Sequence, residues 1–566
     1  MAAPHTPLDD RLSMLERALA DVDQRLRALE SGHAASAPAA LPPGDVGVLP
    51  VPRIDIAGTS ALTGRAFVLL AGAYLLRALT ESGVLDRATG AALGLVYALA
   101  LAVLADRVAT RQRASASFLG GCAVLISLPL IWEITVRFEL VSPVMSAPMI
   151  ACAVAIILAV AWRRDLHALA WVATAGACVL AGALLTVTGV PLPFAWFLVA
   201  LGIVTLWLGY DRGWIGLRWL VALFANFSIV ALIARALASP PREAPESVLA
   251  IVIASLLGYL GSIAIRTLWR KRDVLPFEVV QTAVLLTVGV AGAVLIARET
   301  GSGAQVLGPT LLLLSVAAYT VAFIHREMNA RAANYYFYTT LALVLAVISG
   351  NYMFDGVPAA VVWTVLAVGM GWLGRRFGRI TLHAHAIVYL LVGASMTGLL
   401  VTTLAALFAS AASAPVAAPI YAWLLGAAVL ICWQLSMPPG AVSALTRVPR
   451  IILMLVLVIV AAGACVIAGR TLLSPLLDAS RFAALIATER TATFATGAIL
   501  VAWLGTRAST REFGWLLYPL LGWGLVKLLF EDLRVSPPSF LFVALALYGA
   551  ALIVAPRLVK SASATS

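Results

Sequence analysis

A few ionisable residues interrupt long apolar runs of the sequence, and their types and spacing could support chemistry inside a membrane. Arg77 and Glu81 are four residues apart in LLRALTESGVLDR, and Lys527 and Glu531 have the same separation in GLVKLLFEDLRV. Because four residues make about one helical turn, each pair shares a face on which opposite charges neutralise each other. A charge at membrane depth is costly, so it is usually paired or functional.

The same spacing recurs in reversed order at Glu133 and Arg137, and Asp532 directly follows Glu531. The predicted outer-side polar cluster consists of Arg77, Glu81, Glu133, Arg137, Lys527, Glu531 and Asp532. One interpretation is a polar cavity that is open to the outer side of the membrane. The other is a set of local ion pairs that stabilise span ends and reach the interface. The sequence leaves both open and assigns no catalytic residue.

No pattern in the sequence predicts a metal or a cofactor. His383 and His385 are two residues apart, which places them on nearly opposite faces of a helix, so they do not easily hold one ion. The five cysteines form no C-x-x-C pair, and no nucleotide or hydrolase motif stands in a suitable context. We therefore expect no metal and no cofactor.

Uncharged polar and small residues within the apolar runs predict contacts between helices. Asn226 and Gln281 are expected to donate hydrogen bonds between membrane helices. Gly90 and Gly94 form a G-x-x-x-G pattern, which allows two helices to approach closely.

The composition shows which kind of protein must position these residues. Of 566 residues, 62% are hydrophobic and 12% are charged, whereas a soluble domain is about half apolar and about a quarter charged. These values exclude a soluble enzyme and predict an all-α polytopic membrane protein whose main partner is the lipid bilayer. The net charge of +12 is then attributed to membrane topology and not to nucleic acid.

Apolar stretches long enough to cross a bilayer follow one another from residue 65 to residue 557, and about eighteen transmembrane helices are predicted. Residues 558–566 form a short tail. If the amino terminus is cytoplasmic, inner connections carry twice as many Lys and Arg residues as outer ones. Examples of inner connections are Arg163 with Arg164, the segment from Arg266 to Arg272, and Arg375 with Arg376. The sequence therefore predicts that both termini are cytoplasmic.

Residues 1–31 predict a cytoplasmic coiled coil, and residues 32–64 are an Ala- and Pro-rich flexible linker. Apolar residues alternate at spacings of four and three, which is the heptad seam of paired helices. The seam consists of Leu8, Leu12, Leu15, Leu19, Val22, Leu26 and Leu29. This pattern favours a homo-oligomer, and the alternative is one amphipathic helix that docks on its own membrane domain.

Three stretches resemble a known family. They are the early GRAFVLLAGAYLLRALTESGVLDRATGAALGLVYALALAVLADR, the segment AVAWRRDLHALAWVATAGACVLAGALLTVTG, and the carboxy-terminal LVKLLFEDLRVSPPSFLFVALALYGAALIVAPRLVK. In these features the chain is similar to the bacterial multi-pass membrane proteins of domain-of-unknown-function family 2339. In the third stretch the aromatic residue lies further from Lys527 than is usual in that family. The resemblance implies a bacterial inner-membrane protein and supplies no activity.

Three functions are compatible with these observations. The first is a non-enzymatic envelope scaffold or maintenance factor that oligomerises through its coiled coil. The second is a transporter or flippase of an amphiphilic or lipid-linked substrate. The third, an enzyme acting on a lipid-linked substrate at the outer face, is disfavoured because no acidic pair stands in a sizeable outer loop.

Overall fold

The computed structural model describes residues 72, 76–80, 82–301, 303–327, 332–409, 418–436, 444–473, 479–507 and 513–564. Among these residues every regular element is a helix, as the sequence predicts. The predicted coiled coil and linker, and Glu81, lie outside the described residues. The chain divides into two units, residues 1–69 and 70–566, and only the second contains described helices.

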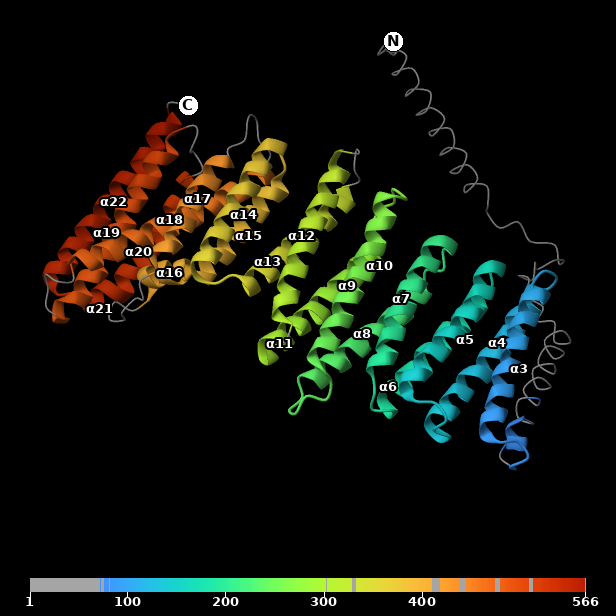
Figure 1. Cartoon of the computed structure of the whole chain (residues 1–566). Coiled ribbons are helices and arrows are strands. Elements are labelled where there is room, and N and C mark those ends of the chain that lie inside the picture. Colours follow the sequence, from blue (N-terminus) through green and yellow to red (C-terminus); the bar gives the residue numbers. More distant parts are fainter. Residues whose placement is uncertain are drawn as a thin grey trace, which may run out of the picture. The chain divides into compact units, whose positions relative to one another are not determined.

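The α-helices of the second unit are labelled in Figure 1. The α-helices are α3 (Arg87–Val108), α4 (Arg113–Trp132), α5 (Pro143–Arg164), α6 (His167–Val187), α7 (Leu192–Arg212), α8 (Leu217–Ala236), α9 (Pro245–Leu268), α10 (Pro276–Val284), α11 (Ala291–Thr300), α12 (Ala304–Glu327), α13 (Ala332–Met353), α14 (Gly356–Phe377), α15 (Ile380–Met396), α16 (Leu399–Phe408), α17 (Trp423–Leu435), α18 (Ala444–Leu473), α19 (Ala479–Gly505), α20 (Leu517–Lys527), α21 (Leu533–Val535) and α22 (Pro538–Ala564). Three π-helical segments are η1 (Glu133–Arg137), η2 (Leu285–Val290) and η6 (Leu528–Asp532), and η3 (Ile420–Ala422) is a short 3₁₀ turn.

Fourteen helices of the described part are long and apolar enough to cross a membrane, or fifteen if the bent pair α15 and α16 counts as one span. This count is lower than the predicted eighteen for identifiable reasons. The first predicted span lies largely outside the described residues, and the span expected near Ala417 forms only a short helix at residues 420–435. The span expected from Thr491 belongs to α19, which begins earlier, at Ala479, and is not among the fourteen.

Helix ends follow local sequence signals. The Asp86 carboxylate caps α3 by accepting hydrogen bonds from the backbone N–H groups of Ala88 and Thr89. These hydrogen bonds lower the pKa of Asp86, with the Thr89 contact contributing most. At the other end of a helix, Gly213 adopts the left-handed conformation that terminates α7, and Gly378 does the same for α14.

Most helix contacts join elements that are close in sequence. Besides each next neighbour, α3 packs on α5, α4 on α6, α5 on α7 and α7 on α9. Close approach in this part depends on Gly90 and Gly94, as the sequence predicts. A Cβ atom would lie 2.0 Å from Oγ1 of Thr80 at Gly90, and 2.6 Å from Cδ2 of Leu130 at Gly94.

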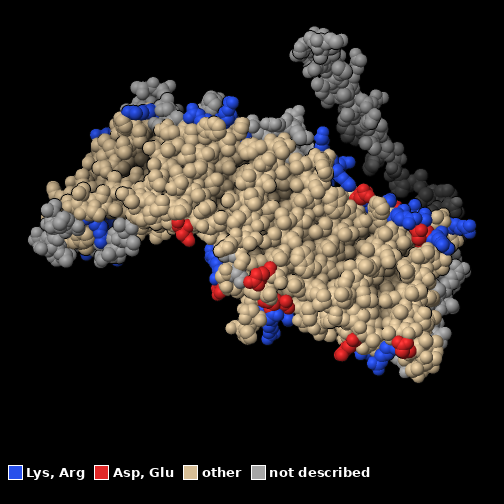
Figure 2. Space-filling view, in the orientation of Figure 1, with Lys and Arg blue, Asp and Glu red and all other residues tan. Residues whose placement is uncertain are grey.

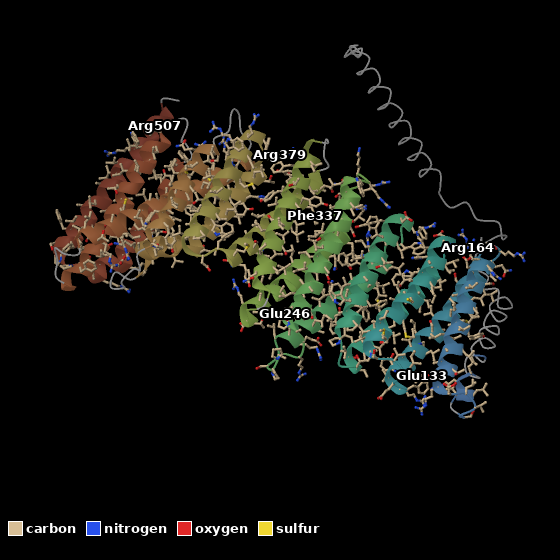
Figure 3. All side chains as sticks on the ribbon, viewed as in Figure 1. Glu133, Arg164, Glu246, Phe337, Arg379 and Arg507 are labelled. Carbon is tan, nitrogen blue, oxygen red and sulfur yellow. The ribbon has the colours of Figure 1, made fainter. Side chains whose placement is uncertain are left out.

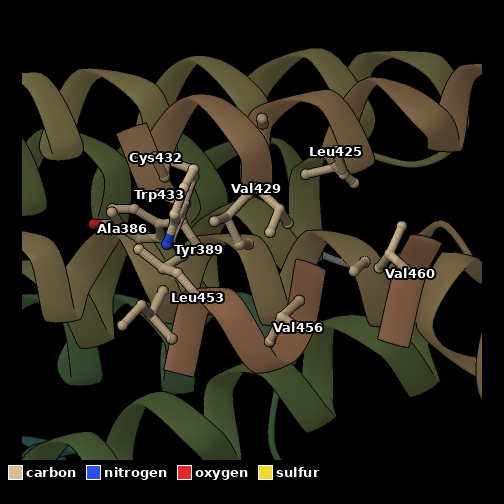
Figure 4. Packing of buried hydrophobic residues seen from close by; sticks show 14 of the residues in the cluster. Ala386, Tyr389, Leu425, Val429, Cys432, Trp433, Leu453, Val456 and Val460 are labelled. Carbon is tan, nitrogen blue, oxygen red and sulfur yellow. The ribbon is translucent and has the colours of Figure 1, made fainter. Parts of the chain in front are cut away.

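An apolar core joins α14, α15, α17 and α18. Figure 4 shows Tyr389 of α15, Val429 and Trp433 of α17, and Leu453 and Val456 of α18 gathered in this core. The Tyr389 ring is fully buried, and its centroid lies 5.7 Å from that of Trp363 on α14. These helices therefore support one another and fix the position of the bent pair.

Charged side chains lie mainly along two edges of the face in Figure 2, and an uncharged band separates them. In Figure 3, Arg164, Arg379 and Arg507 lie at one end of the helices, while Glu133 and Glu246 lie at the opposite end. The three arginines come from predicted inner connections, and the two glutamates come from the opposite set. This arrangement is that of a multi-pass membrane protein in which successive helices alternate in direction.

Candidate functional site

The structure distributes the predicted polar residues over two sites. Arg77, Glu133 and Arg137 meet beside α3 and α4, and we call them the Glu133 cluster. Lys527, Glu531 and Asp532 meet two further residues of α19, and we call this group the Lys527 cluster. It consists of Arg490, Thr491, Lys527, Glu531 and Asp532. Among the described residues, no ion pair or hydrogen bond joins the two clusters.

The centre of the Lys527 cluster is a buried ion pair. Nζ of Lys527 lies 2.7 Å from Oδ2 of Asp532, and the Asp532 side chain is fully buried. The hydroxyl of Thr491 accepts a hydrogen bond from Lys527 at 2.7 Å and donates one to Asp532 at 2.8 Å. Lys527 also donates to the backbone carbonyl of Ala487. Three donors of one ammonium group are thereby matched to three acceptors.

The second ion pair of the cluster reaches the end of the bent span. Nη1 of Arg490 lies 2.8 Å from Oε1 of Glu531, and the same nitrogen donates to the backbone carbonyl of Ala409 at 2.6 Å. Ala409 is the residue that follows α16, so its carbonyl is one that a helix end leaves without an internal partner. A buried charge therefore satisfies the terminus of an interrupted membrane helix.

The interruption itself lies between α15 and α16, whose axes differ in direction by 75°. Gly398 adopts a φ of +77°, which side-chain-bearing residues rarely adopt, and starts α16. Further along α16, a Cβ atom at Gly463 of α18 would lie 2.6 Å from Cβ of Thr403. At its end, the Phe408 ring packs edge-on against Trp523, with centroids 5.1 Å apart.

Two buried polar atoms of the cluster have no hydrogen-bond partner among the described residues, namely Oδ1 of Asp532 and Nε of Arg490. Such atoms are costly to leave unsatisfied, and they mark sites that accept water, a proton or a ligand. The formal charges of Arg490, Lys527, Glu531 and Asp532 cancel. The cluster is thus neutral overall and still has capacity for one further donor and one further acceptor.

The Glu133 cluster is more open. Nη2 of Arg77 lies 2.8 Å from Oε1 of Glu133, whereas Nη1 of Arg137 lies 3.8 Å from the same oxygen. The Arg77 side chain is 40% exposed. Arg77 and Glu133 line a largely apolar cavity of about 330 Å³ between residues 76–80, α3 and α4, with Phe138 at its rim. This site combines one ion pair with an apolar wall.

The predicted partners are therefore only partly those observed. Lys527 lies 3.8 Å from Glu531, the predicted i,i+4 partner, but 2.7 Å from Asp532. Glu133 is paired more closely with Arg77 than with Arg137. Sequence reasoning missed Arg490 and Thr491. Arg490 was recognisable as a charge inside an apolar segment, but the start predicted for that span placed it in an outer loop.

Other polar residues have structural roles. Asn226 and Gln281 form two reciprocal amide hydrogen bonds of 2.9 Å and 3.1 Å, which confirms their predicted role between helices. His385 is buried, and the hydroxyl of Tyr319 lies 3.0 Å from its Nδ1. In the described part of the chain, no group of three or more His, Cys, Asp or Glu side chains is placed to hold a metal ion.

Comparisons with models of known protein families, with curated proteins and with solved structures find no match to this chain.

Proposed function

We propose that this multi-pass membrane protein transports an amphiphilic or lipid-linked substrate. We also propose that the Lys527 cluster is the polar site that rearranges during transport. The observation that carries the proposal is the contact of Arg490 with the carbonyl of Ala409. It links a buried ion-pair network directly to the end of an interrupted span. Interrupted helices with ionisable partners are a recurrent construction of transporter binding sites.

Two physical arguments support a role beyond anchoring. First, a charge that only anchors a span end reaches outward to the interface, whereas Arg490, Lys527 and Asp532 are each less than a tenth exposed. Second, a π-helical segment is found frequently at functional sites, and Leu528–Asp532 is such a segment. The Glu133 cluster adds an ion pair beside an apolar cavity, a combination that suits an amphiphile.

The test uses purified protein in vesicles that contain a phospholipid with a fluorescent group on its acyl chain or headgroup. An added quencher that does not cross the bilayer reports how much of the probe reaches the outer leaflet. The expected result is that vesicles with the wild-type protein expose nearly all of the probe, while protein-free vesicles expose about half. Equal quenching in both preparations would reject transport of this substrate class.

The decisive variant exchanges the two central charges, Lys527→Asp with Asp532→Lys. The exchange keeps an ion pair, but the new carboxylate at position 527 cannot donate to the carbonyl of Ala487, so the unfolding temperature of this variant is measured beside its transport. A variant that folds with near wild-type stability and has lost transport supports a transport site, because the positions of the two charges then matter beyond their pairing. Thr491→Val is the milder companion, since it keeps both charges and removes the hydroxyl between them. Arg376→Gln, an exposed site on α14, is the matched control.

The scaffold hypothesis remains a second proposal, and its support is the heptad seam at residues 8–30. Leu15→Asp with Leu26→Asp introduces charges into that seam and is expected to lower the oligomer size measured by light scattering. An unchanged size would exclude assembly through these residues. A bacterial inner-membrane location, cytoplasmic termini and membership of family 2339 also belong to the proposal. Labelling of single cysteines from either side of the membrane tests the orientation.

A further inference from the structure

A second charged site lies at the predicted cytoplasmic ends of α7 to α10, far in sequence from the Lys527 cluster. Tyr210, Arg266, Arg270 and Arg272 line a polar cavity of about 380 Å³. Tyr210 lies near the end of α7 and Arg266 near the end of α9, while Arg270 and Arg272 belong to the connection to α10. The inference drawn from this cavity does not rest on the proposed transport function.

The carboxylate of Glu278 holds two of the residues that line this cavity, Tyr210 and Arg266. Glu278 is fully buried and accepts from the hydroxyl of Tyr210 at 2.5 Å, from Nη1 of Arg266 at 3.1 Å and from the backbone N–H of Leu275 at 2.7 Å. The same Arg266 nitrogen donates to the backbone carbonyl of Asp273 at 2.7 Å. Among the described residues, Glu278 forms its ion pair with Arg266 and none with Arg270 or Arg272.

The remaining charges of the site are predominantly positive. Arg270 has one distant carboxylate, Oδ1 of Asp211 at 3.9 Å, and its guanidinium lies over the Trp207 ring. Arg218, on the first turn of α8, is 4% exposed and lies over the Phe277 ring, 4.7 Å from its centroid. Its Nε and Nη1 atoms have no hydrogen-bond acceptor among the described residues. No carboxylate in the described part of the chain pairs with Arg272.

The connection that carries Arg270 and Arg272 is held in a defined position. Asn334 of α13 is buried, and its side-chain amide binds this connection twice. Its Oδ1 accepts from the backbone N–H of Val274 at 2.8 Å, and its Nδ2 donates to the carbonyl of Arg272 at 3.1 Å. The arginines are therefore presented from a backbone that is fixed before any ligand arrives, which lowers the entropic cost of binding.

The surrounding aromatic residues indicate the level of the membrane at which the cavity lies. Trp269 directly follows α9 and is 82% exposed, and Trp219 of α8 and Trp162 of α5 are also exposed at helix ends of the same predicted side. Exposed tryptophans of membrane proteins collect at the level of the lipid headgroups. A basic pocket between membrane helices at this level suits an anionic headgroup.

From these observations we infer that the cavity binds a phosphate group, with the guanidinium groups of Arg270 and Arg272 as its principal donors. Arginine matches phosphate oxygens with two parallel N–H donors, so two arginines on one cavity wall hold a phosphate firmly. The headgroup of an anionic phospholipid supplies this chemistry at the membrane surface, and a free phosphate compound supplies it from solution. The experiment separates these two sources.

The measurement is native mass spectrometry of delipidated full-length protein with added phosphatidylglycerol or phosphatidylcholine, together with thermal unfolding in inorganic phosphate. Retention of phosphatidylglycerol over phosphatidylcholine is expected. Each lost arginine contact is expected to weaken binding about five-fold, and the double variant Arg270→Gln with Arg272→Gln about twenty-five-fold. Arg376→Gln removes one positive charge from an exposed position elsewhere on the predicted cytoplasmic side and is expected to change binding less than two-fold.

The outcomes separate clearly. If the double variant no longer retains phosphatidylglycerol, and inorganic phosphate does not stabilise the wild-type protein, the ligand is a lipid headgroup. If inorganic phosphate stabilises the wild-type protein and not the double variant, the ligand comes from solution. Unchanged lipid retention and phosphate response in the double variant, or equal losses in Arg376→Gln, would overturn the inference. Both arginines are exposed, so circular dichroism is expected to show an unchanged helix content in the double variant.

Discussion

Lys527 is paired with Asp532, five residues further along the chain, and not chiefly with Glu531, four residues further. This relationship follows from the π-helical segment Leu528–Asp532. There the N–H of Leu533 donates to the carbonyl of Leu528, five residues earlier, so residues five apart come onto one face. Glu531 is turned toward Arg490 by the same change. One irregular turn therefore creates two ion pairs, Lys527 with Asp532 and Glu531 with Arg490 of α19.

Removing one member of the central pair is expected to be strongly destabilising. Lys527→Met leaves the buried Asp532 carboxylate without its cation, which costs on the order of 3–5 kcal/mol for a buried pair. Thermal unfolding of the purified protein, followed by its own tryptophan fluorescence, measures the loss. The double variant Lys527→Met with Asp532→Leu is expected to recover most of it. If single and double variants are equally unstable, the pair is not the cause.

The Glu133 cluster is expected to respond weakly. Arg77 is 40% exposed, and water screens an ion pair at such a position. Arg77→Gln should therefore cost less than about 1 kcal/mol. Glu133→Gln is the matched variant, because Glu133 contacts both arginines of the cluster. A loss of stability as large as that of Lys527→Met would show that the cavity beside α4 is more enclosed than the exposure of the Arg77 side chain indicates.

The amide pair of Asn226 and Gln281 is expected to contribute moderately to stability. Side-chain hydrogen bonds between membrane helices average about 0.6 kcal/mol, with a maximum near 1.7. Two reciprocal bonds therefore predict a coupling energy of about 1–2 kcal/mol in a double-mutant cycle with Asn226→Leu and Gln281→Leu. Additive effects of the two substitutions would show that the amides do not act as a pair.

Close packing at Gly463 is expected to be sensitive to size. A Cβ atom there would lie 2.6 Å from Cβ and 2.9 Å from the carbonyl oxygen of Thr403, so α16 and α18 would have to separate. Gly463→Val is expected to destabilise the protein by about 1–3 kcal/mol through overpacking. Gly369→Val is the control, because a Cβ atom at Gly369 would meet no atom within 4 Å. Equal unfolding temperatures of the two variants would contradict this account.

The sequence predicted the helical fold and most of the spans, because an apolar run of about twenty residues has few alternatives. It also predicted the Asn226–Gln281 contact, since a buried amide in an apolar helix needs a partner. The partners of Lys527 and Glu133 could not be predicted in the same way. They depend on where a helix departs from regular geometry and on which helices become neighbours, and neither follows from spacing along one helix.

The bent span was also beyond the sequence. TLHAHAIVYLLVGASMTGLLVTTLAALF reads as one continuous apolar helix, and the turn at Gly398 becomes recognisable only from its backbone conformation. Arg490 was interpreted as a loop residue because its span was predicted to start at Thr491, whereas α19 begins at Ala479. Its contact with the carbonyl of Ala409 could not be expected, since that carbonyl belongs to a helix end that the sequence does not indicate.

The π-helical turns have a consequence for the tolerance of the chain to deletions. Spans that contain Glu133–Arg137, Leu285–Val290 or Leu528–Asp532 hold one residue more than a regular helix of the same length requires. Deleting Leu529 alone should return its span to a regular helix without moving the flanking loops. The same deletion in the middle of α7 would rotate half of that helix by about 100° against its neighbours. Among the described spans, these three are therefore the ones that are expected to lose a single residue and still fold.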